Sequence, residues 1–241
     1  MARIISFALG SVWRWEKSPN RNDFIKYVKN LDIDGVELTF SSKEELFAFK
    51  LSQDNEKLLR GLDFVTVHAP FGLVEKADNE QELIKQLEVI AKIYQQVGAK
   101  NVIIHPHDLP DRQMLDKFNF KVSTENLRQR RKITIADLEK IFVKYPKIGL
   151  CLDVAHAYSW SKNETSNLIK AFGHKITQFH LSGSYRNKDH QSMRKVSPNF
   201  LASIELLLKA KAPIIIEENI KIKSEKYLKE EVEFIKKMFG A

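Results

Sequence analysis

Residues 148–156 read IGLCLDVAH, an apolar run that ends in Asp153 and is followed three residues later by His156. The same arrangement recurs along the chain, where short apolar, β-branched runs end in a residue that can bind a metal ion. The other runs are FVTVHAP (64–70), NVIIHPH (101–107), FKVSTEN (120–126), ITQFHLS (176–182) and PIIIEEN (213–219). A succession of such endings implies that these side chains meet at a common point in space.

The apolar runs alternate with segments of helical period, which predicts repeated strand–helix units and a parallel sheet. We expect strands near 3–8, 34–39, 63–68, 101–105, 120–125, 148–153, 176–181 and 213–217. We expect helices near 19–30, 42–60 (with a possible break), 78–97, 110–117, 134–144, 161–172, 197–209 and 224–239. This alternation indicates a single (β/α)8 TIM barrel over residues 1–241, in which functional groups lie at the C-terminal ends of the strands.

The competing fold is an open, doubly wound sheet. That fold needs a glycine-rich phosphate turn after the first strand, and ALGSVWRW (8–15) does not have the usual spacing. The sequence therefore favours the barrel.

The charge balance of the chain is basic, with 39 Lys+Arg against 31 Asp+Glu and a net charge of +8. A basic surface favours nucleic acid or another phosphorylated partner, but lysine-rich surfaces are also common in proteins from hot environments. No run of about 18 uncharged apolar residues suggests a membrane span, and the single Cys151 fits a reducing cytosol. We expect a cytoplasmic monomer without a membrane partner.

Four of the strand-end residues form a candidate metal site. Glu125, Asp153, His180 and Glu217 follow strands five to eight and could surround one ion. Carboxylates and imidazoles together suit zinc, manganese or iron, and the lack of thiolates argues against a structural zinc site. We expect a catalytic divalent metal, zinc first and manganese as the alternative.

The remaining histidines extend this prediction to further ions. His68 and His105 end neighbouring strands, where Glu125 could bridge them to a second ion. His156 and His190 follow later strands and are candidate ligands too. For any one of these histidines the alternative is a hydrogen-bonded barrel residue.

Aromatic and basic residues after the strand ends are candidate substrate contacts, with loop packing as the alternative. Several arginines of these loops, such as Arg128 and Arg130, could hold phosphates. The candidate substrate contacts are Trp13, Trp15, His107, Tyr158, Trp160, Tyr185 and Arg186. Glu37, which ends the second strand, is expected to pair with a basic residue.

Several segments resemble the superfamily that joins endonuclease IV with the xylose isomerase-like sugar isomerases and epimerases. These segments are DGVELTF (34–40), TEN (124–126), CLDVAHAYSW (151–160), QFHLSGS (178–184) and PIIIEEN (213–219). The resemblance covers nearly the whole chain. It implies that Glu125 bridges two ions, of which His68 and His105 complete one, and Asp153, His180 and Glu217 the other.

The resemblance also implies a third ion, held by two histidines and an aspartate. His156 and His190 match the histidines, but Lys188 stands where the aspartate is expected, two residues before His190, and Asp189 is adjacent instead. We therefore expect two or three ions, and Lys188→Asp is expected to raise a count of two to three.

Two reactions are compatible with this site. A nuclease would use the metals to activate water and clamp a phosphate, with Glu125 and Glu217 as catalytic residues and DNA with abasic sites as substrate. A sugar or sugar-phosphate isomerase or epimerase would need one ion, while Glu125 and Glu217 exchange a proton with carbon. The histidines beyond those needed for one ion, together with the positive charge, favour the metal-dependent hydrolase. A third possibility is a barrel that binds a metal or ligand without catalysing a reaction.

Overall fold

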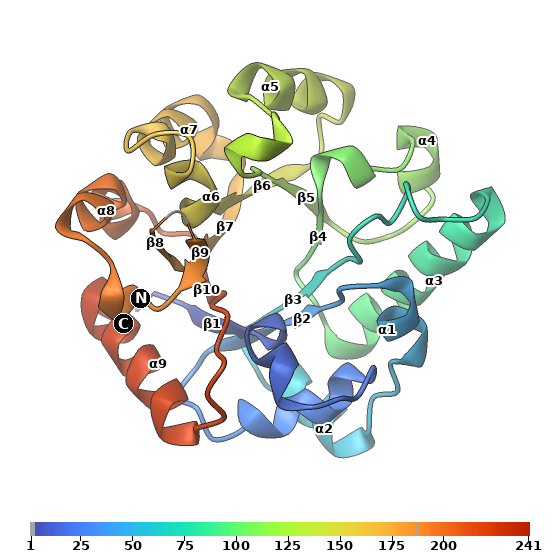
Figure 1. The fold of residues 1–241 in the computed structure, drawn as a ribbon. Coiled ribbons are helices and arrows are strands. Elements are labelled where there is room, and N and C mark those ends of the chain that lie inside the picture. The colour runs from blue at the N-terminus through green and yellow to red at the C-terminus, as the bar shows by residue number, and fades with distance from the viewer. Residues whose placement is uncertain (1–2, 187) are drawn as a thin grey trace.

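The computed structural model describes residues 3–186 and 188–241, and eight parallel strands in it close into a barrel (Figure 1). Their order around the barrel is β1-β10-β7-β6-β5-β4-β3-β2, so that β1 pairs with both β2 and β10. The barrel strands are β1 (Ile5–Ala8), β2 (Gly35–Thr39), β3 (Phe64–His68), β4 (Asn101–Ile104), β5 (Val122–Glu125), β6 (Gly149–Asp153), β7 (Ile176–Leu181) and β10 (Ile214–Ile216). The predicted TIM barrel is confirmed, with a strand at every predicted position.

Helices surround the strands (Figure 1). The α-helices are α1 (Lys43–Ala48), α2 (Gln53–Arg60), α3 (Glu80–Val97), α4 (Arg112–Leu115), α5 (Ile135–Lys144), α6 (Val154–Tyr158), α7 (Glu164–Phe172), α8 (Pro198–Ser203) and α9 (Glu225–Phe239). The 3-10 helices are η1 (Leu9–Trp15), η2 (Arg21–Tyr27), η3 (Pro106–Asp108), η4 (Gln129–Arg131), η5 (Gly173–Lys175), η6 (Met193–Lys195) and η7 (Glu205–Lys209). None of the helices in the described part of the chain is long and apolar enough to cross a bilayer.

Some helix predictions were wrong in type or length. The segment predicted as a helix near 19–30 is the 3-10 helix η2. The possible break in the segment near 42–60 is confirmed, because this segment forms the two helices α1 and α2. Only α4 forms in the region 110–117. The short helix α6, which was not predicted, begins directly after β6 because the side chain of Asp153 caps it by accepting the amide hydrogen of His156 (2.6 Å).

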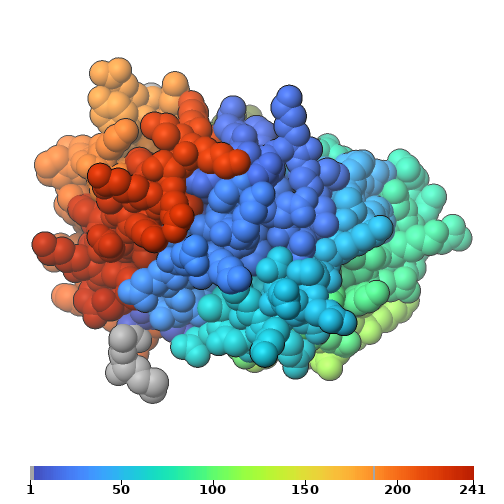
Figure 2. Space-filling view, turned by 90° about the horizontal axis from the view of Figure 1, so that it is seen from below, coloured from blue at the N-terminus to red at the C-terminus, as the bar shows by residue number. Residues whose placement is uncertain are grey.

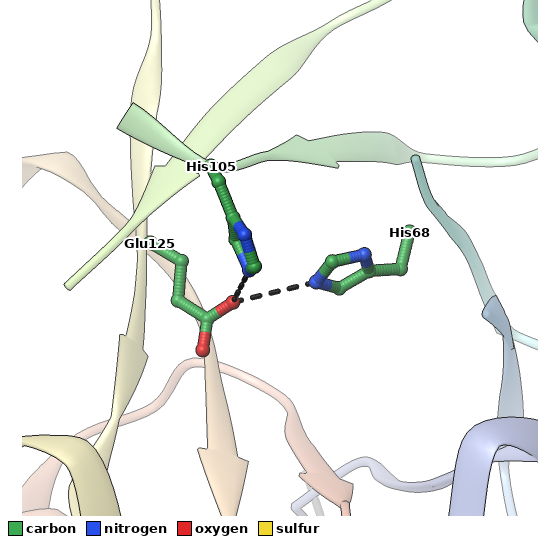
Figure 3. A group of neighbouring side chains, drawn as sticks. All are labelled: His68, His105 and Glu125. Carbon is green, nitrogen blue, oxygen red and sulfur yellow. Dashed lines mark hydrogen bonds and ion pairs between the residues drawn. The ribbon is translucent and has the colours of Figure 1, made fainter. Parts of the chain in front are cut away.

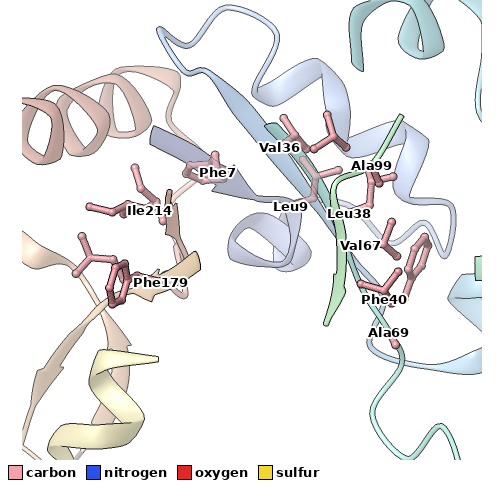
Figure 4. Close-up of a cluster of buried hydrophobic side chains, with 14 of the residues drawn as sticks. Phe7, Leu9, Val36, Leu38, Phe40, Val67, Ala69, Ala99, Phe179 and Ile214 are labelled. Carbon is pink, nitrogen blue, oxygen red and sulfur yellow. The ribbon is translucent and has the colours of Figure 1, made fainter. Parts of the chain in front are cut away.

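Alternate residues of each strand face opposite sides of the barrel wall. Val36 and Leu38 of β2 belong to the apolar layer between strands and helices (Figure 4). Glu37 between them faces the interior, where its Oε2 accepts a hydrogen bond from Gln178 Nε2 of β7 (2.9 Å). The apolar layer holds the barrel together, so the interior can carry polar side chains.

A two-stranded hairpin, β8 (Gly183–Tyr185) and β9 (Lys188–Gln191), follows β7. Two of its non-glycine residues have left-handed backbone, Arg186 (φ 50°) and His190 (φ 51°). A Cβ at Gly183 would lie 2.4 Å from Val196 Cγ1, so the hairpin can fold back closely only with glycine there. This hairpin was not predicted.

The two ends of the chain close the barrel together. Figure 2 shows the C-terminal segment, in red, against the N-terminal third, in blue. The register of β1 with β10 pairs Phe7 with Ile216, and the amide of Ile214 donates to the carbonyl of Ile4 (3.0 Å).

Candidate metal centre

The predicted ligands converge at the C-terminal ends of the strands. His68 and Glu125 are the last residues of β3 and β5, and His105 directly follows β4. In Figure 3 both imidazoles point toward the carboxylate of Glu125. The Nε2 atoms of His68 and His105 each lie 3.4 Å from Glu125 Oε2. These three residues can therefore offer one ion two nitrogens and an oxygen.

The orientation of His68 is fixed by its other ring nitrogen. Nδ1 lies 2.9 Å from the carbonyl oxygen of Ala69, and a carbonyl can only accept, so Nδ1 carries the hydrogen. When the imidazole is neutral, Nε2 therefore carries the free electron pair and faces Glu125, which is the arrangement that metal-binding histidines adopt.

A second group combines Glu125 with Asp153, His180 and Glu217, whose ligand atoms all lie within 4.8 Å of one another. His180 Nδ1 is 2.9 Å from Glu217 Oε2 and 3.6 Å from Glu125 Oε1. Its Nε2 lies 3.2 Å from Oε2 of the buried Glu37, which also accepts from Thr66 and Gln178. Glu37 thus pairs with His180, as expected, and turns its Nδ1 toward the centre.

Unpartnered atoms show that this second group fits a cation. Asp153 Oδ2 is buried and has no hydrogen-bond partner among the described residues, and His180 Nδ1 and Glu217 Oε2 lie 2.9 Å apart as an ion pair without the geometry of a hydrogen bond. Burying polar atoms without partners is costly. A divalent ion coordinated by these nitrogen and oxygen donors would remove that cost.

A third group consists of His156, Asp189 and His190. The Nε2 atoms of both histidines lie 3.7 Å from Asp189 Oδ2, while their Nδ1 atoms face the carbonyls of Asn126 (3.1 Å) and Glu217 (2.9 Å). The third site was expected to need an aspartate at position 188, where this chain has an exposed lysine. In the structure the neighbouring residue Asp189 brings a carboxylate to this group instead. The prediction that Lys188→Asp adds a missing ligand loses its basis.

A fourth group, His105, His107 and Asp108, overlaps the first through His105. Both oxygens of Asp108 are occupied, because Oδ2 accepts from the amide of Gly72 (2.8 Å) and Oδ1 from that of Val74 (3.3 Å). Asp108 fastens the loop after β3, and His107 stands beside the centre as a partly exposed neighbour.

The ionisable groups of the centre shift one another's pKa values. Burial raises the pKa of Glu125, but the positive charge of His180 and hydrogen bonds from His105 and His156 hold it well below its usual value. Burial lowers the pKa of His156, but Asp153 and Glu125 raise it to about 10. At His105 burial prevails and the pKa is lowered. Protons on the imidazoles thus balance the carboxylates, and a bound cation would take over that role.

Three adjoining cavities open around the centre. One cavity of about 350 Å³ has a lining that includes His68, His105, His107, Glu125 and Glu217. Another, of about 560 Å³, contains predicted contacts and neighbouring basic residues: Arg128, Arg130, Tyr158, Tyr185 and Arg186. A third, of about 410 Å³, contains Trp13, His190 and Glu217. The structure therefore places these predicted contacts next to the centre.

The two other predicted substrate contacts, Trp15 and Trp160, are not among the residues that line these three cavities, and both use their indole groups to bind the backbone. Trp15 is buried, and its indole N–H donates to the carbonyl of Ile220 (2.8 Å). The indole N–H of Trp160 donates to the carbonyl of Leu127 (2.8 Å) and so fixes the loop after β5. In both cases the side chain finds a backbone partner, which a sequence pattern does not reveal.

Sequence reasoning missed Phe71, which is 39% exposed and lines two of the cavities. Its ring lies 5.5 Å from that of His68 and 5.0 Å from that of His105. The available signal was an aromatic residue three positions after a strand-end histidine. Asp189 was not predicted as a candidate ligand, because its position depends on the hairpin.

Comparison with known families agrees with this geometry. The family model described as xylose isomerase-like TIM barrel matches residues 25–238, and the chain belongs to this family. No curated protein sequence matches the chain.

Solved structures of similar fold include both branches that the sequence resembles. The endonuclease IV of Thermus thermophilus superposes with a TM-score of 0.67 at 16% identity, covering 98% of this chain and 97% of that one. A D-tagatose 3-epimerase-like protein gives 0.65 at 18%, covering 98% and 99%. The 3-keto-D-glucoside 4-epimerase of E. coli gives 0.67 at 13%, covering 98% and 99%. At these identities the likeness establishes the fold.

Proposed function

We propose that the chain is a divalent-metal-dependent phosphodiesterase of the endonuclease IV kind, which cleaves DNA at abasic sites. The observation that carries this proposal is the third donor group, His156, Asp189 and His190. One ion would suffice for the isomerase or epimerase reaction considered above, and the group of Glu125, Asp153, His180 and Glu217 could already hold it. The additional donors of the third group are explained by a phosphodiesterase reaction that uses several metal ions.

Zinc is the metal that we propose, with manganese as the alternative, because the donors are imidazoles and carboxylates without thiolates. His68, His105 and Glu125 would hold one ion, and Glu125 with Asp153, His180 and Glu217 another. When bound, such ions supply Lewis acidity toward the phosphate and lower the pKa of water.

The side chains of the chain have distinct roles in this proposal. Glu217 faces the centre beside His180 and would orient the attacking water. The new bond joins the water oxygen to phosphorus, one ester bond of the phosphodiester breaks, and the leaving oxygen takes up a proton. Arg130 and Arg186 in the cavity of about 560 Å³ would bind neighbouring phosphates of the strand.

The exposed aromatic residues fit a nucleic-acid substrate. Trp13 is 46% and Tyr185 47% exposed, and they line cavities on different sides of the centre. Flat aromatic surfaces of this kind can stack on bases. A nucleotide that has lost its base leaves the helix at modest unstacking cost, which would let its sugar enter the barrel mouth.

The second candidate is a sugar or sugar-phosphate isomerase or epimerase. One observation favours it: Glu217 Oε2 and Glu125 Oε1 both face His180 Nδ1, at 2.9 and 3.6 Å. Two carboxylates at one point could remove a proton from carbon and return it. The basic cavity would then hold the phosphate of the sugar.

One experiment separates the two candidates. Bound metals per chain are counted by elemental analysis, and the same sample is assayed on duplex DNA with one abasic site and on the intact duplex. Two or three ions with incision only at the abasic site support the nuclease. A single ion without incision, together with interconversion of phosphorylated ketoses and aldoses, would overturn it in favour of the isomerase.

A further inference from the structure

A second basic cavity lies at the opposite end of the barrel from the metal centre. Its volume is about 550 Å³, and its lining includes the residues that begin β4, β5 and β6. Four lysines stand at the beginnings of four neighbouring strands. Lys100, Lys121 and Lys175 directly precede β4, β5 and β7, and Lys147 stands two residues before β6. Strand pairing therefore brings four ammonium groups to one cavity.

The charge of this lysine cavity is not balanced by its own walls. His174 also lines it, and none of the described residues that line it is an aspartate or glutamate. Among the described residues, Lys147 forms an ion pair with Asp116, whose Oδ1 lies 3.9 Å from Lys147 Nζ. Asp116 also pairs with Arg112. Like charges gathered at one concavity repel one another, and a bound anion relieves that repulsion.

The lysine cavity also has a polar lining deeper in. Asn101 is only 3% exposed, and its Nδ2 donates to Ser123 Oγ (2.8 Å) and Thr177 Oγ1 (3.1 Å). Its Oδ1 is buried and has no hydrogen-bond partner within the described ranges 3–186 and 188–241. Such an oxygen can accept from a hydroxyl group of a ligand.

One of the lysines is held in place by the backbone. Lys175 Nζ donates to the carbonyl of Pro146 (2.6 Å) and lies 3.4 Å from that of Ile148. Carbonyl oxygens fix the position of an ammonium group without neutralising its charge. The lysine cavity thus keeps a preorganised cation beside the exposed side chains of Lys121 and Lys147.

We propose that the lysine cavity binds a compact polyol that carries two or more phosphate groups. The lysines match the phosphates, Asn101 Oδ1 matches a hydroxyl, and about 550 Å³ is the size of a small-molecule site. The cavity is a binding site in its own right, because it lies at the beginnings of the strands and the barrel interior separates it from the metal centre at their C-terminal ends.

The test is calorimetric titration of the metal-loaded protein with fructose 1,6-bisphosphate, a polyol with two phosphates. In Lys121→Gln/Lys147→Gln the affinity is expected to fall at least about tenfold, or ~1.4 kcal/mol. The matched control is Lys226→Gln/Lys229→Gln, which removes the same charge from the exposed face of α9 and is expected to keep the affinity.

A third variant, Lys121→Arg/Lys147→Arg, retains the charges and is expected to bind within a few-fold of the unsubstituted chain, which separates loss of charge from misfolding. Equal losses in the cavity variant and the α9 control would mean unspecific attraction and overturn the proposal. So would absence of binding, or a loss confined to Arg130→Gln at the metal end. Metal content and incision are measured separately, so the result does not depend on the reaction proposed above.

Discussion

Arg128 Nη1 lies 3.0 Å from Asp189 Oδ1, joining the loop after β5 to the hairpin after β7. The other oxygen of Asp189 is thereby turned toward both His156 and His190, at 3.7 Å from each Nε2. The guanidinium thus positions a carboxylate that the sequence pattern alone did not assign to the site.

The first prediction concerns this ion pair. Arg128→Ala is expected to weaken metal binding at the third group by roughly 10–100-fold, as loss of an outer partner of a ligand does. The measurement is a zinc titration with elemental analysis. Arg131→Ala, a matched change in η4, is the control and is expected to keep the count. Equal stoichiometry and affinity in both variants would show that Arg128 does not position Asp189.

The second prediction concerns Glu125, which belongs to two donor groups. Glu125→Gln keeps the shape of the side chain and removes its charge, so bound metal and activity are expected to be lost together. Metal affinity is expected to fall by more than roughly 100-fold, the upper limit for loss of a residue that only positions a ligand. Circular dichroism should show an intact barrel. Glu75→Gln, at the rim of the same cavity, serves as the control. Full metal content and turnover in the Glu125 variant would contradict the bridging role.

The third prediction tests Glu37 as the residue that orients His180. Glu37→Gln is expected to reduce metal affinity by roughly 10–100-fold, because the partner of His180 Nε2 loses its negative charge. Thr66→Val removes another hydrogen bond to the same carboxylate without touching His180, so its effect should be smaller. If both variants bind metal like the unsubstituted chain, His180 does not need Glu37.

The fourth prediction is a release of protons. The pKa of His156, raised to about 10, means that this imidazole is protonated at pH 7 in the metal-free chain. A histidine ligand must be neutral, so binding displaces the proton, and the apparent metal affinity should increase with pH at any pH below about 10. Calorimetry in two buffers of different ionisation enthalpy measures the release. Identical heats in both buffers would contradict it.

The barrel could be predicted because its strands are short, apolar and separated by helical segments. The residue at each strand end was also visible, so candidate ligands from β3, β5, β6 and β7 could be named before the fold was known. Their orientation could not, because it depends on partners far away in the sequence, such as Glu37 for His180.

The hairpin escaped prediction for a different reason. Residues 183–191 contain few apolar side chains, and left-handed backbone of the kind found at Arg186 and His190 is uncommon for residues other than glycine. The contacts of the folded protein stabilise it there. The sequence comparison therefore expected the carboxylate two residues before His190, at Lys188, whereas in the folded chain Asp189 lies beside both histidines.

The double use of Asp153 has a consequence for two of the donor groups. One carboxylate oxygen caps α6 through the amide of His156, and the other faces the second donor group. Replacing Asp153 would remove a donor from one group and release the helix turn that carries a donor of another. A single substitution at Asp153 is therefore expected to weaken both donor groups at once.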